Sequence, residues 1–130
     1  MTPRVMLVDD HELLAHSLRA ALGAEGFEVV VPPGLTDAEV LGHAEGLRPG
    51  IVLLDLHLAD DERTSVGLIG PLCDLGATVV MVTGDTHRHR LAECIEAGAL
   101  GWVTKAEPFD HLVEAVRGVA AGRQLLGVSQ

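Results

Sequence analysis

The chain has 130 residues, of which 48% are hydrophobic and 22% are charged, a balance typical of one compact folded domain rather than a disordered or fibrous chain. Nineteen acidic residues against nine basic ones give a formal net charge of −10, so the chain lacks the positive field that binding to nucleic-acid phosphates requires. The apolar runs are too short to cross a membrane and the N-terminus lacks the apolar core of a signal peptide, so we expect a cytoplasmic protein with no membrane partner.

Short apolar runs recur along the chain about every two dozen residues, and each is expected to be a strand. Their apolarity is continuous rather than alternating, which indicates strands covered on both faces, as in a parallel sheet. The pattern therefore predicts an α/β domain with five βα units and a parallel five-stranded sheet. We assign it to the flavodoxin-like (βα)5 type, a doubly wound sheet for which the strand order would be 2-1-3-4-5. The five expected strands are 5–8, 27–31, 51–54, 79–82 and 102–103.

The segments between these runs differ in how clearly they favour helices. Apolar residues keep helical spacing in 14–22, in 91–98 and, most clearly, in 109–120, which lies between Pro108 and Gly122. The segment 36–45 is short, and 67–75 contains two glycines and Pro71, so a short or irregular third helix is expected.

Residues beyond the last helix and the two cysteines carry less information. The segment 123–130 loses the helical pattern, and we interpret 1–122 as the folded domain and 123–130 as a tail or the start of a linker to a further domain. Cys73 and Cys94 fit no zinc or redox spacing and are interpreted as small core residues.

Reactive side chains follow four of the five strands directly. Ligands of an open parallel sheet lie beyond the carboxyl ends of its strands, and the order 2-1-3-4-5 makes the first and third strands neighbours at the switch point. Each residue alone has an ordinary structural explanation, such as a helix N-cap, a turn, a strand residue or a surface charge. Their joint placement favours a single site. The residues are Asp9 and Asp10, Asp55, Thr83 and Lys105.

Three carboxylates in one pocket need a counter-charge. Each pair repels by about 4 kcal/mol at 4 Å if the effective dielectric is ~20. Mg²⁺ suits a site of few carboxylates completed by water and a phosphoryl group, so the sequence predicts Mg²⁺. With Lys105 and the metal neutralising phosphoryl oxygens, a carboxylate can attack phosphorus and form an acyl phosphate, while Thr83 hydrogen-bonds the group.

These residues resemble the receiver domain of bacterial two-component response regulators, from Arg4 to about Gly122. The resemblance rests on VMLVDDHELL, VLLDLHL, VVMVTGD and GWVTKA and on the intervals between them. It implies that Asp55 is the phosphoacceptor for a sensor histidine kinase and that Asp9, Asp10, Asp55 and the backbone carbonyl of His57 hold Mg²⁺.

The resemblance also implies a switch. Thr83 and Lys105 would sense the phosphoryl group, and Trp102 would change rotamer with Thr83. The fourth helix, fifth strand and fifth helix would rearrange and form the surface where relatives dimerise or contact effectors. His57 and Asp85 stand where the family tunes the lifetime of the phosphoryl group.

The closing segment, LVEAVRGVAAGRQLL, resembles the receiver end of NarL/FixJ-type regulators. Those proteins continue into a LuxR-type helix-turn-helix domain, which this sequence does not contain. The resemblance implies a transcription regulator that meets DNA only through such an absent domain, or a single-domain receiver.

The loop after Asp55 departs from the family pattern. Ala59 and Arg63 replace the usual Pro and Gly, and three acidic residues, 60–62, lie between them. This leaves open an alternative in which the domain is a phosphorylation-independent binding or dimerisation module. Ala106 replaces a common Pro, which leaves the geometry of the Lys105–Ala106 bond open.

Further hypotheses concern enzymatic activity and the histidines. A receiver promotes its own phosphorylation and slow dephosphorylation, whereas a phosphatase acting through an aspartyl phosphate would need a second Asp at the position of His57. His11, beside the acidic pair, is interpreted as solvent-facing, with a pH-sensing role as the alternative. His87 and His89 give only a weak metal signal, because no third ligand accompanies them.

Overall fold

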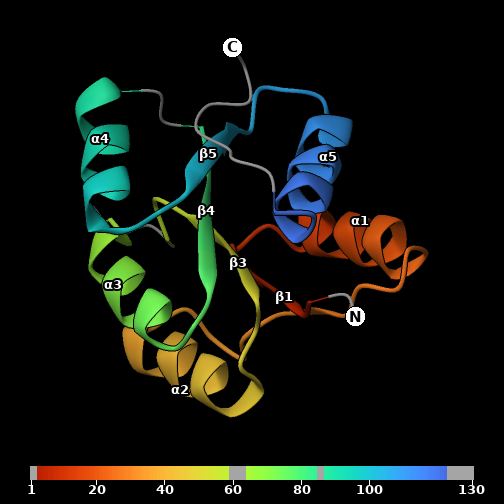
Figure 1. Ribbon diagram of the computed structural model, residues 1–130, viewed down its shortest axis with the longest axis horizontal. Coiled ribbons are helices and arrows are strands. Elements are labelled where there is room, and N and C mark those ends of the chain that lie inside the picture. The colour runs from red at the N-terminus through yellow and green to blue at the C-terminus, as the bar shows by residue number, and fades with distance from the viewer. Residues whose placement is uncertain (1–2, 59–63, 85–86, 123–130) are drawn as a thin grey trace.

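The computed structural model describes residues 3–58, 64–84 and 87–122, which form a five-stranded parallel sheet flanked by five helices (Figure 1). The strand order is β2-β1-β3-β4-β5, which confirms the predicted topology. The strands are β1 Val5–Val8, β2 Val29–Val30, β3 Ile51–Asp55, β4 Thr78–Thr83 and β5 Gly101–Thr104. The helices are α1 Glu12–Gly23, α2 Asp37–Leu47, α3 Val66–Asp74, α4 Arg88–Ala97 and α5 Phe109–Ala120.

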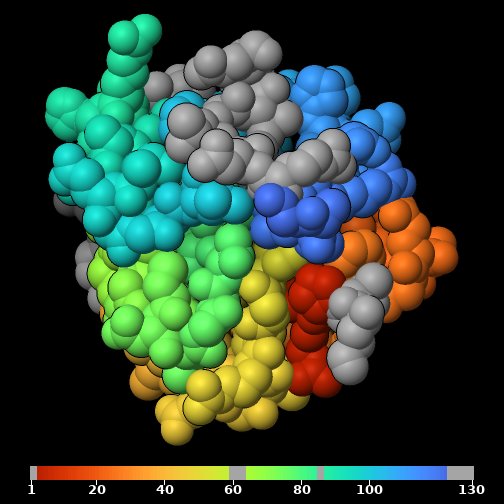
Figure 2. Space-filling model, in the orientation of Figure 1, coloured from red at the N-terminus to blue at the C-terminus, as the bar shows by residue number. Residues whose placement is uncertain are grey.

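Helices cover both faces of the sheet, as the continuous apolar strands predict. Helices α1 and α5 share one apolar cluster with the sheet, and α2, α3 and α4 share a second cluster on the opposite face (Figure 1). In Figure 2 the surfaces of α3 and α4 lie next to each other on one side of the molecule. All residues of β1 are buried, because successive side chains enter the two clusters in turn.

Strand β2 is shorter than predicted. Its expected range was 27–31, but only Val29 and Val30 pair with β1. Pro32 and Pro33 follow after one further residue, Val31, and have no N–H to donate to a sheet, which limits the pairing of this edge strand. Phe27 still packs in the core although it lies outside the strand.

The helix boundaries follow local chemistry. Thr36 and Glu39 form a capping box at the start of α2, with the Glu39 N–H donating to Thr36 Oγ1 at 3.2 Å. Helix α3 has nine residues and contains Pro71, which agrees with the expected short helix. Helix α5 presents the clean apolar stripe that its sequence predicts, with four residues buried: Leu112, Val113, Ala115 and Val116.

The structure also bears on the two cysteines, on the bond geometry that the sequence left open and on membrane-spanning helices. Cys94 is fully buried, as expected, but Cys73 is only half-buried and donates its thiol to the Gly98 carbonyl at 3.6 Å. The described residues contain no cis peptide bond, so the Lys105–Ala106 bond is trans. Among the described helices, none has the length and apolarity that a membrane span needs.

Candidate functional site

Strand register places the first and third strand ends side by side. Val8 pairs with Leu54 across β1 and β3, so the next residues, Asp9 and Asp55, stand together at the carboxyl edge of the sheet. Both are buried, each about 5% exposed. Oxygens of Asp9, Asp10 and Asp55 and a ring nitrogen of His11 all lie within 4.8 Å of one another. The structure thus brings together the three carboxylates that the strand order predicts to share a pocket.

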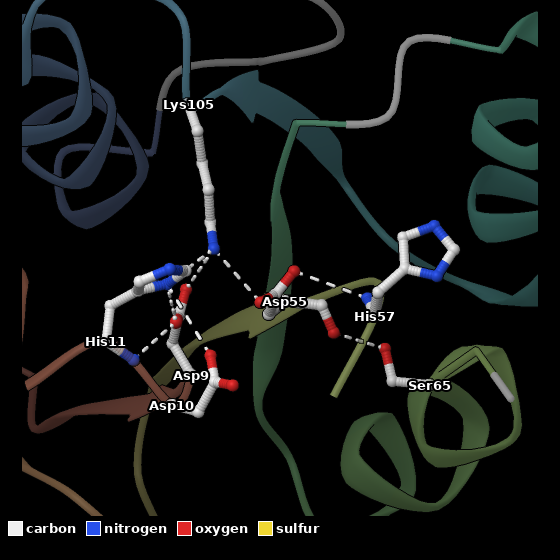
Figure 3. Close-up of polar contacts among 7 residues, drawn as sticks. All are labelled: Asp9, Asp10, His11, Asp55, His57, Ser65 and Lys105. Carbon is white, nitrogen blue, oxygen red and sulfur yellow. Dashed lines mark hydrogen bonds and ion pairs between the residues drawn. The ribbon is translucent and has the colours of Figure 1, made fainter. Parts of the chain in front are cut away.

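Lys105 enters this pocket from the loop after β5 (Figure 3). Its Nζ lies 2.8 Å from Asp9 Oδ2 and 3.0 Å from Asp55 Oδ2. The Lys105 amide also donates to the Thr83 carbonyl at 2.8 Å, which ties this loop to the end of β4. One ammonium therefore bridges two buried carboxylates.

His11 lies closer to the pocket than a purely solvent-facing residue would. Its side chain is 61% exposed, yet Nδ1 is 2.6 Å from Asp9 Oδ1, 3.5 Å from Asp10 Oδ1 and 3.0 Å from Lys105 Nζ. The His11 amide donates to Asp9 Oδ1 at 2.9 Å. His11 is also the N-cap residue of α1, without a side-chain capping bond, so neither Asp9 nor Asp10 fills that capping position.

The two buried carboxylates differ in their pKa directions. Burial raises the pKa of Asp9, but the Lys105 ammonium and the two His11 contacts outweigh it, so that pKa lies below its usual value. Burial is also the largest influence on Asp55, and the negative charge of Asp9 adds to it. Despite Lys105, the pKa of Asp55 is therefore raised. Burial lowers the pKa of Lys105, but its two carboxylate partners raise it further, so Lys105 is held protonated.

The backbone around Asp55 is anchored by a residue that the sequence analysis missed. Ser65, 4% exposed, donates its hydroxyl to the Asp55 carbonyl at 2.6 Å, and its amide donates to the Leu56 carbonyl at 2.8 Å. A serine directly before a helix was the available signal, although this side chain makes no capping bond to α3. The sequence alone does not reveal this contact, because Ser65 and Asp55 come together only in the folded structure.

His57 contributes its backbone to the pocket. Its amide donates to Asp55 Oδ1 at 3.3 Å, and its ring points away from the Asp55 carboxylate (Figure 3). The ring orientation separates the two roles implied for His57: the backbone lies beside the site, whereas the side chain does not face it.

Thr83 and Trp102 lie on the two strands that lead to Lys105. Thr83 is fully buried at the end of β4 and pairs with Thr104 of β5. Trp102 is half-buried against the apolar cluster that α2, α3 and α4 share with the sheet, and it lines a groove with residues of α4. Asp85 and the atypical segment 59–63 lie outside the described residues.

The pocket fits a hard divalent cation by its donor set. Carboxylate oxygens are the side-chain ligands that Mg²⁺ takes in proteins. Asp9 Oδ2 is buried, and its partner is the ammonium of Lys105 at 2.8 Å. A buried carboxylate oxygen favours a neighbouring positive charge, because burial removes it from solvent.

These features define a class: small doubly wound α/β domains with an acidic, lysine-neutralised pocket at the switch point of the sheet. Over residues 5–117 the sequence matches the response regulator receiver domain, and the chain belongs to this family. The resemblance proposed from the sequence motifs is thereby confirmed.

Individual relatives agree with this assignment. The chain is 34% identical over 125 residues to the DNA-binding transcriptional activator DevR/DosR of Mycobacterium tuberculosis, covering 95% of this chain and 57% of that protein. It therefore spans little more than half the length of this relative. A LuxR-family two-component response regulator from Aurantimonas sp. superposes with a TM-score of 0.81 at 28% identity, covering 97% of this chain and 90% of that one.

A third relative was solved in a modified state. It is a response regulator protein from Burkholderia pseudomallei with a phosphorylated aspartic acid, a calcium ion and citrate. Its TM-score is 0.75 at 26% identity, covering 92% of this chain and 69% of that chain. This receiver domain is thus part of a family that includes transcription regulators.

Proposed function

We propose that this domain is a phosphorylation switch in which Asp55 accepts a phosphoryl group from the phosphohistidine of a sensor kinase in the cytoplasm. The observation that carries the proposal is the pocket itself. A buried aspartate at a strand end lies 3.0 Å from a lysine ammonium and within reach of two further carboxylates. The phosphorylated aspartic acid of the Burkholderia relative supports the same chemistry here.

The transfer balances as a displacement at phosphorus. A carboxylate oxygen of Asp55 forms the new O–P bond, the P–N bond to the donor imidazole breaks, and the leaving imidazole keeps that electron pair and takes a proton. Lys105 Nζ, now paired with both Asp9 and Asp55, is placed to neutralise a phosphoryl oxygen. In hydrolysis, water forms a new O–P bond, the Asp55 O–P bond breaks, and inorganic phosphate leaves as the carboxylate is restored.

We further propose that Asp9, Asp10, the Asp55 side chain and the His57 carbonyl hold Mg²⁺. When bound, the ion supplies positive charge that offsets the carboxylates and the phosphoryl oxygens. Backbone amides orient two of these carboxylates: the His11 amide donates to Asp9 and the His57 amide donates to Asp55.

The conformational change would be transmitted from the site by Thr83 and Trp102. A phosphoryl group on Asp55 would attract the Thr83 hydroxyl, and Trp102 on the neighbouring strand would follow. The surface formed by α4, β5 and α5 would then change conformation and favour homodimerisation or the binding of an effector. In this proposal residues 1–122 form the receiver domain and residues 123–130 begin a linker. DNA would be bound only by a further helix-turn-helix domain.

Helix α1 offers a docking surface for the kinase. Leu13 is 77% exposed, which is exceptional for a large apolar side chain among the described residues. It borders a mainly apolar cavity of about 390 Å³ whose lining also includes Leu14, Phe109 and Lys105. An apolar surface that reaches the phosphoryl pocket suits a protein partner that delivers its phosphohistidine there.

Phosphorylation by a small-molecule phosphodonor in Mg²⁺ tests the proposal. Mass spectrometry should find one acid-stable, base-labile phosphate on the wild type and none on Asp55→Asn. Trp102, the single tryptophan, should change its fluorescence on addition of a phosphoryl mimic only in the wild type.

Asp74→Asn is the matched control, because Asp74 is an exposed carboxylate at the end of α3. It should be phosphorylated like the wild type. An unmodified wild type, or equal labelling of Asp55→Asn, would defeat the proposal and favour a phosphorylation-independent module.

A further inference from the structure

His11 stands where its imidazole faces the acidic pocket rather than solvent alone. Its Nδ1 lies 2.6 Å from Asp9 Oδ1 and 3.5 Å from Asp10 Oδ1, and a ring nitrogen of His11 belongs to the group of four ligand atoms within 4.8 Å. Figure 3 shows the ring turned toward Asp9 and Lys105. The nitrogen thus shares the space in which the carboxylates would hold a cation.

The separations match neighbouring ligands of one ion. Ligands at about 2.1 Å from an octahedral ion are about 3 Å apart when adjacent and about 4.2 Å apart when opposite. Nδ1 is separated from the Asp9 and Asp10 oxygens by 2.6 Å and 3.5 Å, on either side of the adjacent value. Small side-chain adjustments would bring all these atoms around one centre.

The contacts of Nδ1 cannot all be satisfied by one tautomer. As a donor, Nδ1–H suits Asp9 Oδ1 but opposes the Lys105 ammonium 3.0 Å away; as an acceptor, its lone pair suits Lys105 but opposes the carboxylate. A metal cation resolves this conflict, because the lone pair and the carboxylate oxygens then face the same positive charge. Asp9 Oδ2 is buried and faces the Lys105 ammonium at 2.8 Å, so the oxygens of this pocket are already directed toward positive charge.

We propose that His11 Nδ1 is a nitrogen ligand in this pocket and that it makes the pocket prefer nitrogen-binding transition cations, such as Co²⁺, over Mg²⁺. The inference rests on the proposed function, since it concerns the same metal site. Mg²⁺ takes oxygen ligands and gains little from an imidazole, whereas later first-row divalent ions bind imidazole strongly. Transition metals would then support or compete with the magnesium-dependent switch.

Calorimetric titrations of the whole chain with Mg²⁺ and with Co²⁺ test the proposal. In His11→Asn the ratio of the Mg²⁺ to the Co²⁺ dissociation constant should fall by roughly tenfold or more, because one nitrogen ligand is lost. Asn is favoured at a helix N-cap, so α1 should retain its start. His16→Asn, which removes an exposed imidazole from α1, should keep the wild-type ratio.

Proton NMR of the Co²⁺ form gives a second reading. The wild type and His16→Asn should show a paramagnetically shifted, exchangeable imidazole N–H resonance that excess Mg²⁺ removes; His11→Asn should lack it. An unchanged affinity ratio in His11→Asn, or a shifted resonance that persists there, would overturn the inference.

The proposed function is judged separately from these results. Wild-type Asp55 that is phosphorylated in Mg²⁺ while the affinity ratio stays unchanged in His11→Asn would refute only the His11 ligand. A lower ratio in His11→Asn together with an unphosphorylated wild type would refute only the phosphoryl switch.

Discussion

Asp9 and Asp55 share the ammonium of Lys105 but have opposite pKa directions. Asp9 also receives the His11 amide and ring, which hold its charge in place, whereas Asp55 has one long bond from His57 and faces the charge of Asp9. The charged Asp55 is therefore the less favourable of the two in the metal-free domain. A carboxylate that is costly to ionise is one whose negative charge a bound cation can usefully compensate.

This asymmetry predicts opposite effects of two isosteric substitutions. A raised pKa in the folded state means that Asp55 contributes stability while protonated and loses it as pH rises through the folded pKa. Asp55→Asn should therefore raise the Tm of the metal-free protein at pH 7 by a few degrees, and the gain should shrink as pH approaches the ordinary value of 3.8.

Asp9 has the reverse dependence. Its lowered pKa means that it contributes stability above pH 3.8, and this is lost as pH falls through the folded pKa. Asp9→Asn should lower the Tm at pH 7. Differential scanning calorimetry without metal checks both, with Asp74→Asn as an exposed control, and equal signs for the two substitutions would contradict the assignment.

Ser65 carries a second prediction at the scale of a residue. Ser65→Ala leaves the Asp55 carbonyl without the 2.6 Å hydroxyl bond in a buried position, so the free energy of unfolding should fall by about 1–3 kcal/mol. Urea denaturation measures it. Ser17→Ala, a half-buried serine on α1, should change stability by less than about 0.5 kcal/mol, as substitutions away from such bonds do.

At the scale of elements, the turn from α4 into β5 depends on one glycine. Gly98 ends α4 with φ of 122°, and a Cβ placed there would meet Cys73 Sγ at 3.2 Å. The same residue accepts the Cys73 thiol bond through its carbonyl. The positive φ and the close approach of α3 both favour glycine, and they fix how α4 leads into the strand that carries Trp102.

Gly98→Ala should therefore lower the free energy of unfolding by at least about 1 kcal/mol, because alanine is strained at this φ. Gly23 provides the contrast: it lies in α1, and a Cβ there would meet nothing within 4 Å. Gly23→Ala should stabilise the domain by about 0.5 kcal/mol. Chemical denaturation of both variants decides the matter, and a neutral Gly98→Ala would contradict this account of the turn.

At the scale of the whole molecule, the net charge of −10 and the acidic pocket make stability depend on cations in two ways. Any salt screens repulsion among exposed carboxylates. A cation bound in the pocket adds linkage, which is worth about 2.7 kcal/mol at a free concentration of 100 times the dissociation constant. Only the second effect requires the side chains gathered by β1 and β3.

Mg²⁺ should accordingly raise the Tm more than Na⁺ at equal ionic strength. Asp10→Asn should remove most of the extra stabilisation, because it removes one negative charge from the proposed cation pocket. Asp37→Asn, which deletes an exposed carboxylate on α2, should keep it. Thermal scans in both salts test this, and identical shifts in Mg²⁺ and Na⁺ would show that the acidic group does not bind the ion.

Sequence patterns alone predicted most of this architecture, because apolar runs with no polar alternation fit only strands covered on both faces. The five parallel strands followed from these runs. The gathering of Asp9, Asp55 and Lys105 followed once the order 2-1-3-4-5 of a doubly wound sheet was assumed, since parallel strands bring their carboxyl ends to one edge. The length of β2 could not be predicted from the apolar run, because it depends on pairing with β1, and only two residues of the run pair.

Contacts between segments far apart in the chain were beyond the sequence. The bond from Ser65 to Asp55 and the approach of Lys105 to the His11 ring depend on how loops return to the sheet. The different pKa directions of Asp9 and Asp55 depend on which N–H groups and charges surround each carboxylate. Composition and periodicity indicate which residues are buried and which form helices or strands. The distances between loops are set only by tertiary packing, which brings together residues far apart in the chain.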